Sequence, residues 1–247
     1  MNGLIFFIEI VLFYLAIIVF VVGTVYRLWY WLKTPVPLRI NLAPAKRTWK
    51  GVVGKIAAEV LLFISLLRSD KQLWVLALAM HVSALIALFG THFFGLIDAG
   101  IDLWTPYYIP GAKTIIYVAA LFAFPLIAAL LLLLIKRVIT KEVRRISIAT
   151  DYVAIGLILL HVSVGTYMSF FTELDMAEVM RWGVGLATFQ PYLVTGSWPF
   201  VMHCATGFTL FMYFPFSKLF HPIGQITNRW TMTQKEVELV AGGRAVR

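Results

Sequence analysis

Five histidines are the residues of this sequence best able to do chemistry, and all five fall inside or at the ends of long apolar segments. They are His81, His92, His161, His203 and His221. An ionisable side chain is costly inside a membrane, so each is a candidate for a functional site. An imidazole can also serve only as a hydrogen-bonding group between packed helices, and for any single histidine both interpretations stay open.

The spacing of four histidines predicts two facing pairs. His81 and His92 are eleven residues apart, which in an α-helix places them within about 20° of one face and about 16 Å apart. His203 and His221 are eighteen residues apart, or about 27 Å along a helix. If the two helices are antiparallel, His92 faces His203 at one depth and His81 faces His221 at another. The unequal lengths require the last helix to tilt, to bend at Pro215 or to end before His221.

Paired imidazoles at two depths are what two six-coordinate hemes need, because heme iron has two axial positions. We therefore predict two heme b groups. His92 and His203 would hold the one nearer the outer surface, and His81 and His221 the one nearer the inner surface. His161 has no partner in this pattern. A packing or pocket role is favoured for it over ligation, and a quinone contact or an alternative heme ligand stays open.

The elements that must position these histidines are membrane helices. Hydrophobic residues make up 61% of the 247 residues and charged residues 13%, against roughly 45–50% and about 25% in soluble proteins. Five apolar segments are long enough to cross a bilayer; they are 3–24, 73–97, 114–135, 150–171 and 198–220. We expect one all-α membrane domain over residues 1–247, a bundle of five transmembrane helices, with a short interfacial helix near 54–68.

The charges predict how this bundle is oriented. All of the 21 lysines and arginines except Lys113 and Arg181 fall in segments on one side of the expected bundle. The positive-inside rule then places the N-terminus outside and the C-terminus in the cytoplasm. The net charge of +9 therefore indicates membrane topology, and we expect no nucleic-acid partner. The single cysteine, Cys204, excludes an iron–sulfur cluster held by this chain alone.

Two segments resemble a known family. The stretches HVSALIALFGTHFFG (81–95) and HCATGFTLFMYFPFSKLFH (203–221) are similar to the gamma subunit of respiratory nitrate reductase, a di-heme, quinol-oxidising cytochrome b. The resemblance implies the same two heme pairs. Members of that family usually separate the first two histidines by ten residues, and here the extra Thr91 makes eleven. The resemblance also implies a quinol site beside the outer heme, with Lys113 as the matching lysine at the start of the third helix. His92 would join this site as a proton acceptor if its free ring nitrogen faces the quinone.

Two further segments resemble one branch of these cytochromes. TPVPLRI (34–40) and GKIAAEVLLFISLLR (54–68) are similar to the membrane cytochrome of the Dsr complex of sulfur and sulfate metabolism, and to its relative in heterodisulfide reductase. This resemblance implies menaquinone as the substrate and a cytoplasmic iron–sulfur partner of the heterodisulfide reductase D type. Further membrane and extracytoplasmic redox subunits are also implied.

The sequence thus predicts the quinone-reactive electron-transfer subunit of a respiratory oxidoreductase in the cytoplasmic membrane, incomplete as an enzyme by itself. One alternative is the gamma subunit of a nitrate-reductase-type complex. Another is a proton-coupled transporter without heme, whose histidines relay protons. A purely structural anchor would leave four co-facial histidines unexplained.

Overall fold

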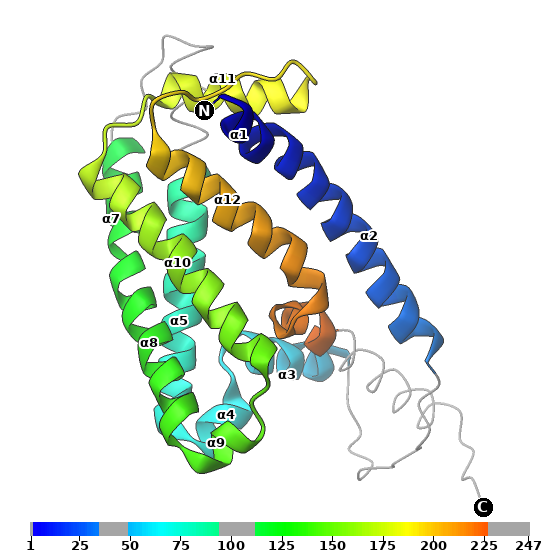
Figure 1. The fold of residues 1–247 in the computed structure, drawn as a ribbon. Helices are drawn as coiled ribbons and strands as arrows, with labels where there is room; N and C mark the ends of the chain where they lie inside the picture. The colour runs from blue at the N-terminus through cyan, green and yellow to red at the C-terminus, as the bar shows by residue number, and fades with distance from the viewer. Residues whose placement is uncertain (1, 35–48, 94–111, 227–247) are drawn as a thin grey trace, which may run out of the picture.

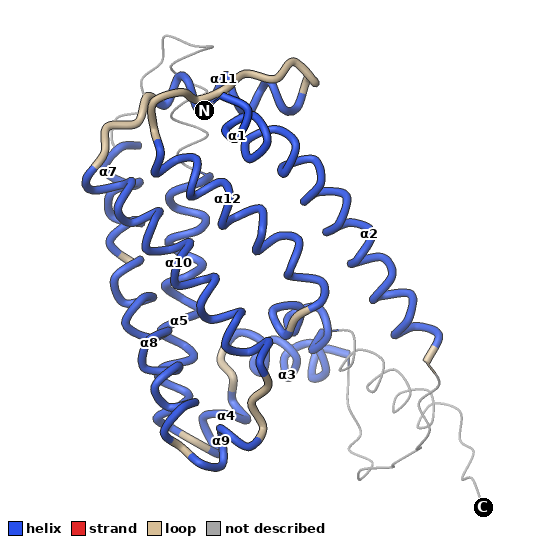
Figure 2. Tube along the Cα trace, viewed as in Figure 1, coloured by secondary structure: helices blue, strands red, loops and turns tan. Residues whose placement is uncertain are grey.

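The computed structural model describes residues 2–34, 49–93 and 112–226. Every regular element within these ranges is a helix (Figure 2). Four of the helices are long and apolar enough to cross a membrane; they are Gly3–Lys33, Lys71–His92, Tyr117–Ile139 and Ala149–Phe171. The chain is therefore a multi-pass membrane protein. The segment expected to form a fifth span is also helical, but it is shorter than these four.

The first span is longer than the sequence suggested. It comprises α1 (Asn2–Phe6), a π-helical turn η1 (Phe7–Val11) and α2 (Leu12–Lys33), whereas residues 3–24 were expected. The helix ends where Thr34 adopts an extended conformation. The next residue is Pro35, and a proline disfavours the helical conformation of the residue before it.

The short helix expected over 54–68 is two helices. They are α3 (Trp49–Leu61) and α4 (Ile64–Ser69), separated by Phe63 in the left-handed conformation with φ of 50°. The Glu59 carboxylate bridges the break, since it accepts hydrogen bonds from the Ser65 backbone N–H at 3.0 Å and the Ser65 hydroxyl at 2.7 Å.

The second and third spans form a helical hairpin. The second comprises α5 (Lys71–Leu88) and a π-helical turn η2 (Phe89–Phe93), and the third comprises α7 (Ala112–Leu121) and α8 (Ala123–Ile139). The third span is interrupted by a turn at Phe122. Pro125 lacks the N–H that would bond the carbonyl of Leu121, which explains a break at this point.

Three helices follow in the second half of the chain. They are α9 (Lys141–Arg145), the fourth span α10 (Ala149–Phe171) and α11 (Met176–Ala187). Residues 176–187 lie outside the five spans and the short helix expected from the sequence, so α11 was not predicted. Asp175 caps its first turn by accepting a hydrogen bond from the Ala177 N–H at 2.8 Å, as expected at a helix N-terminus.

The helix expected as the fifth span, α12 (Trp198–Tyr213), has 16 residues and is about 24 Å long. A helix over 198–220 was expected, but the α-helix stops at Tyr213 because Pro215 cannot donate to the carbonyl of Phe211. Two short 3-10 helices follow, η3 (Phe214–Phe216) and η4 (Lys218–Phe220), and residues 221–226 are helical again.

The helices are arranged as a loose bundle with two distinct ends (Figure 1). The N-terminus and α11 lie at one end, here called the α11 end, and α4 and α9 lie at the other, the α9 end. Within the bundle α5 packs on α8, α10 on α12, and α12 on α2. Large apolar side chains such as Ile18, Val22 and Leu132 are exposed on its outside, as expected of helices that face lipid.

Candidate functional site: two pairs of facing histidines

The structure brings His92 and His203 together from different helices. His92 lies in η2 and His203 in α12. Their Nε2 atoms are 3.4 Å apart, and their ring centroids are 5.7 Å apart. The two side chains therefore meet end to end across the space between the second span and α12.

His81 and His221 form the second pair. Their ring centroids are 5.8 Å apart and the ring planes are nearly perpendicular, at 86°. Of the three possibilities for the last helix, the structure has the one in which the helix ends before His221. The turns η3 and η4 replace the end of the helix. The distance from His203 to His221 is therefore not that of an unbroken eighteen-residue helix, and it can match the distance from His81 to His92.

An arginine on the first span anchors the segment that carries His221. The Arg27 guanidinium donates hydrogen bonds to the carbonyls of Pro215 and, at 2.9 Å, Ser217. It also lies over the rings of Trp31 and Phe220, at 5.1 and 5.0 Å from their centroids. In the sequence, Arg27 is recognisable only as one of the many charges on the basic side.

Asp151 is a second anchor of the same segment. Its side chain is buried, and Oδ2 accepts hydrogen bonds from Arg137 at 3.0 Å and Lys218 at 2.9 Å. The carbonyl of Lys218 in turn accepts from His221 Nδ1 at 2.9 Å. Asp151 therefore joins α8, α10 and η4. In the sequence, Asp151 stands out only as an acidic residue at the start of a membrane helix that follows a run of basic residues.

Hydrogen bonds to the backbone fix the tautomer of three of the paired histidines. The Nδ1–H of His81 donates to the carbonyl of Ala77 at 2.7 Å, and that of His92 to the carbonyl of Leu88 at 3.1 Å. The His221 bond to Lys218 has the same form. A carbonyl can only accept, so the proton is on Nδ1 and Nε2 keeps its lone pair. Metal-binding histidines are commonly oriented in this way.

The extra residue Thr91 lies within a π-helical turn, η2, together with His92. A π turn closes its hydrogen bond one residue later than an α turn, so it accommodates one added residue. The Thr91 hydroxyl donates to the carbonyl of Ala87 at 2.6 Å. The added residue is thus absorbed locally, and His92 still faces His203.

The His92–His203 pair fits a metal held between two imidazoles. Metal–imidazole bonds are about 2.0–2.1 Å long, so two opposed ligands need nitrogens roughly 4 Å apart, close to the 3.4 Å found here. The buried Nδ1 of His203 has no hydrogen-bond partner, and such an orphaned atom calls for an explanation. A Cβ on Gly165 would lie 2.9 Å from His203 Cε1, so this glycine makes room for the ring.

His161 joins the His92–His203 pair, which the spacing argument did not predict. Its ring stacks on that of His203 with centroids 4.1 Å apart. The ligand atoms of His92, His161 and His203 all lie within 4.8 Å of one another. The other expected site residue, Lys113, is the second residue of α7, but its side chain lies outside the described part of the structure.

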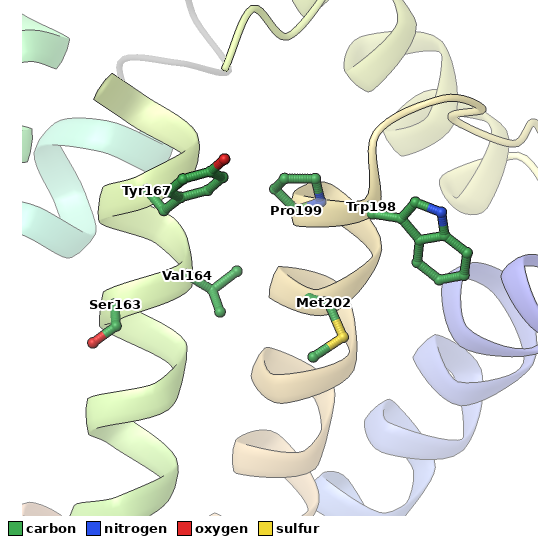
Figure 3. A pocket seen from close by; sticks show the side chains of 6 residues that line it. All are labelled: Ser163, Val164, Tyr167, Trp198, Pro199 and Met202. Carbon is green, nitrogen blue, oxygen red and sulfur yellow. The ribbon is translucent and has the colours of Figure 1, made fainter. Parts of the chain in front are cut away.

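An open groove of about 390 Å³ lies between α10 and α12. Figure 3 shows its lining, contributed by Ser163, Val164, Tyr167, Trp198, Pro199 and Met202. The lining surface is almost entirely apolar and includes none of the five histidines. The groove therefore offers no imidazole that could ligate a metal, and it is separate from the histidine pairs.

Comparisons with known proteins agree with the resemblance drawn from the sequence. The family model described as nitrate reductase gamma subunit matches residues 64–236. The Hdr-like menaquinol oxidoreductase cytochrome b-like subunit of Archaeoglobus fulgidus is 27% identical over 254 residues, with 85% of this chain and 74% of the relative covered. Its counterpart in Archaeoglobus profundus is 26% identical, with the same coverage.

A third relative is the respiratory nitrate reductase 1 gamma chain of Escherichia coli strain K12. It is 24% identical over 180 residues, with 67% of this chain and 80% of the relative covered. The family model spans well over half of the sequence and includes both histidine pairs. This chain belongs to the nitrate reductase gamma subunit family.

Proposed function

We propose that this chain is the membrane cytochrome b subunit of a quinone oxidoreductase, and that it holds two hemes. The observation that carries the proposal is the pairing of four imidazoles, His92 with His203 and His81 with His221. Each pair joins the second span to α12 or to the segment that follows it. Facing imidazoles supply the two axial ligands that a six-coordinate heme requires.

In this proposal His92 and His203 hold the outer heme, and His81 and His221 hold the inner one. A bound heme would supply one-electron chemistry, because its iron alternates between two oxidation states. The chain's own residues orient the imidazoles: backbone carbonyls hold Nδ1 of His81, His92 and His221. Arg27 and Asp151 fix the segment that presents His221.

The charges at the two ends of the bundle support an orientation. Basic residues at and next to α9 include Lys136, Arg137, Lys141, Arg144 and Arg145, whereas Glu173, Asp175 and Glu178 lie at or next to α11. The positive-inside rule then places the α9 end in the cytoplasm and the N-terminus outside the cytoplasmic membrane. The inner heme would lie toward the α9 end.

We infer that the electrons pass between menaquinone and a cytoplasmic iron–sulfur protein of the heterodisulfide reductase D type, within sulfur or sulfate metabolism. The names of the two Archaeoglobus relatives support menaquinol and an Hdr-like complex. With one cysteine, this chain needs a partner to hold an iron–sulfur cluster. Further membrane and extracytoplasmic redox subunits would complete the complex.

Lys113 is the proposed contact to the quinone beside the outer heme. His92 was also expected there, but its Nδ1–H is bonded to the Leu88 carbonyl and its Nε2 would ligate the heme, so no ring nitrogen of His92 is left for the quinone. An ammonium there would donate a hydrogen bond to a quinone oxygen and stabilise the negative charge that develops on it. In Lys113→Met, reduction of the hemes by a menaquinol analogue should slow by about tenfold or more. Reduction by dithionite should be unchanged. Equal rates in Lys113→Met and the parent chain would remove Lys113 from the site.

The decisive experiment is a reduced-minus-oxidised absorption spectrum of the purified chain with a pyridine hemochrome assay. Two b-type hemes per chain are expected. A colourless protein would end the proposal and favour the proton-coupled transporter.

A gamma subunit of a nitrate-reductase-type complex is the second candidate, favoured by the alignment to 80% of the Escherichia coli chain. The two candidates differ in their partners. Copurification from the native membrane followed by mass spectrometry should recover an iron–sulfur protein like heterodisulfide reductase in the first case. In the second case it should recover nitrate reductase subunits.

A further inference from the structure

Three imidazoles from three helices converge at the place proposed for the outer heme. His92 comes from η2, His161 from α10 and His203 from α12. Their ligand atoms all lie within 4.8 Å of one another. Iron in a porphyrin has two axial positions, so this site has one imidazole more than the pair that the proposed function uses.

His161 and His203 occupy equivalent positions on two interlocked helices. A Cβ on Gly207 would lie 3.1 Å from Cε1 of His161, and a Cβ on Gly165 would lie 2.9 Å from Cε1 of His203. Each histidine stands four residues before the glycine of its own helix. Each ring therefore rests on the glycine of the opposite helix, and the two rings stack with an interplanar angle of 20°.

The hydrogen bonds of His161 prepare its Nε2 as a ligand. The Thr206 hydroxyl donates to the carbonyl of Met202 at 2.9 Å, so its oxygen accepts from the Nδ1–H of His161 at 3.0 Å. Thr206 is buried. His161 therefore keeps its lone pair on Nε2, as His92 does. The Nδ1 of His203, in contrast, has no partner at all.

We propose that His161 is an interchangeable axial ligand of the outer site, able to take the position of His203 opposite His92. This inference rests on the proposed function, which assigns the outer heme to His92. Both candidates are neutral imidazoles, so exchanging one for the other moves neither an electron nor a proton. The inner pair, His81 and His221, has no such third imidazole among the described residues.

The experiment compares heme content and low-spin heme signals by electron paramagnetic resonance in the full-length purified chain. His203→Ala should keep two hemes per chain, with the outer signal altered. The double variant His203→Ala with His161→Phe should keep one. Phenylalanine preserves an aromatic ring over Gly207 but offers no nitrogen, so the comparison isolates ligation from packing. His161→Phe alone should retain two hemes.

One heme per chain in His203→Ala, equal to the double variant, would overturn the inference and leave the proposed function intact. A parent chain without heme would overturn both. If His203→Ala does not fold, His203→Val adds apolar volume in the helix but leaves the ligand position open, and it has the same expected outcome, two hemes per chain with His161 present and one without it.

Discussion

At the scale of single residues, three histidines make the same kind of hydrogen bond to a nearby backbone carbonyl. The Nδ1–H of His81 and of His92 donates to the carbonyl four residues earlier, and that of His221 to the carbonyl three residues earlier. In each case the accepting carbonyl belongs to the helix or turn that carries the histidine. Nε2 is thereby aimed outward without any help from another element, and this part of the site needs no tertiary contact.

A glycine beside His203 gives a prediction at the same scale. In Gly165→Ala the new Cβ would lie 2.9 Å from Cε1 of His203, so the ring must shift and the outer heme signal should change. Crowding of this kind costs about 1–3 kcal/mol. Thermal unfolding and electron paramagnetic resonance of the purified chain would measure both effects.

Gly156→Ala, on the same helix, is the matched control. A Cβ at Gly156 meets no atom within 4 Å, so alanine should stabilise the helix by roughly 0.5–1 kcal/mol and leave both heme signals unchanged. Equal responses of Gly165→Ala and Gly156→Ala would contradict the close packing of His203 on α10.

At the scale of elements, proline and buried charge decide where helices end and how those ends are held. Pro215 stops α12 at Tyr213, and the turns η3 and η4 that follow are tied down by Arg27 and Asp151. The position of His221 therefore depends on α2, α8 and α10, although His221 itself belongs to none of them.

Asp151→Asn tests this dependence. An amide oxygen cannot balance the charges of Arg137 and Lys218, and a buried polar group that loses its partner costs about 1–3 kcal/mol. We expect a lower thermal midpoint and a changed signal of the inner heme, with the outer heme unaffected. Asp175→Asn, at the exposed N-terminus of α11, is the control and should change neither signal. An inner heme signal that is unchanged in Asp151→Asn would refute the anchoring role.

Asp70 gives a prediction about pH. Hydrogen bonds from the Leu73 backbone N–H and from the Lys136 ammonium lower the pKa of the Asp70 carboxyl below its ordinary value. A carboxyl whose pKa is lower in the folded chain stabilises the fold above its unfolded pKa, about 3.9. That contribution is lost as the pH falls through the folded value.

Asp70→Asn should therefore be less stable than the parent chain near neutral pH, and the difference should shrink as the pH is lowered below about 4. Thermal unfolding over a pH series would measure it. The side chain is partly exposed, so the effect should be modest. A difference that stays constant across the series would exclude the ion pair with Lys136 as its source.

At the scale of the whole molecule, the orientation in the membrane can be tested with one exposed residue at each end of the bundle. Arg144 is exposed at the α9 end and Arg181 is exposed on α11. In sealed membrane vesicles of known orientation, a membrane-impermeant thiol reagent should label Arg144→Cys only from the cytoplasmic side and Arg181→Cys only from the outside. Cys204 is buried and should give no background. The reverse pattern would invert the proposed orientation.

The sequence by itself determined the membrane class, the presence of the four long helices and the candidate histidine pairs. These follow from apolar length and from spacing along one helix, which are local properties. Two features were not predicted correctly. The end of α12 at Tyr213 depends on a proline, and α11 is an amphipathic segment too short to stand out from the sequence.

Only the tertiary structure decided that His161 joins His92 and His203, and that Arg27 and Asp151 hold the segment of His221. These contacts link residues from 42 to 190 positions apart. Each depends on which faces of separate helices pack together, and helix periodicity fixes a residue's direction on its own helix but not the neighbour it meets.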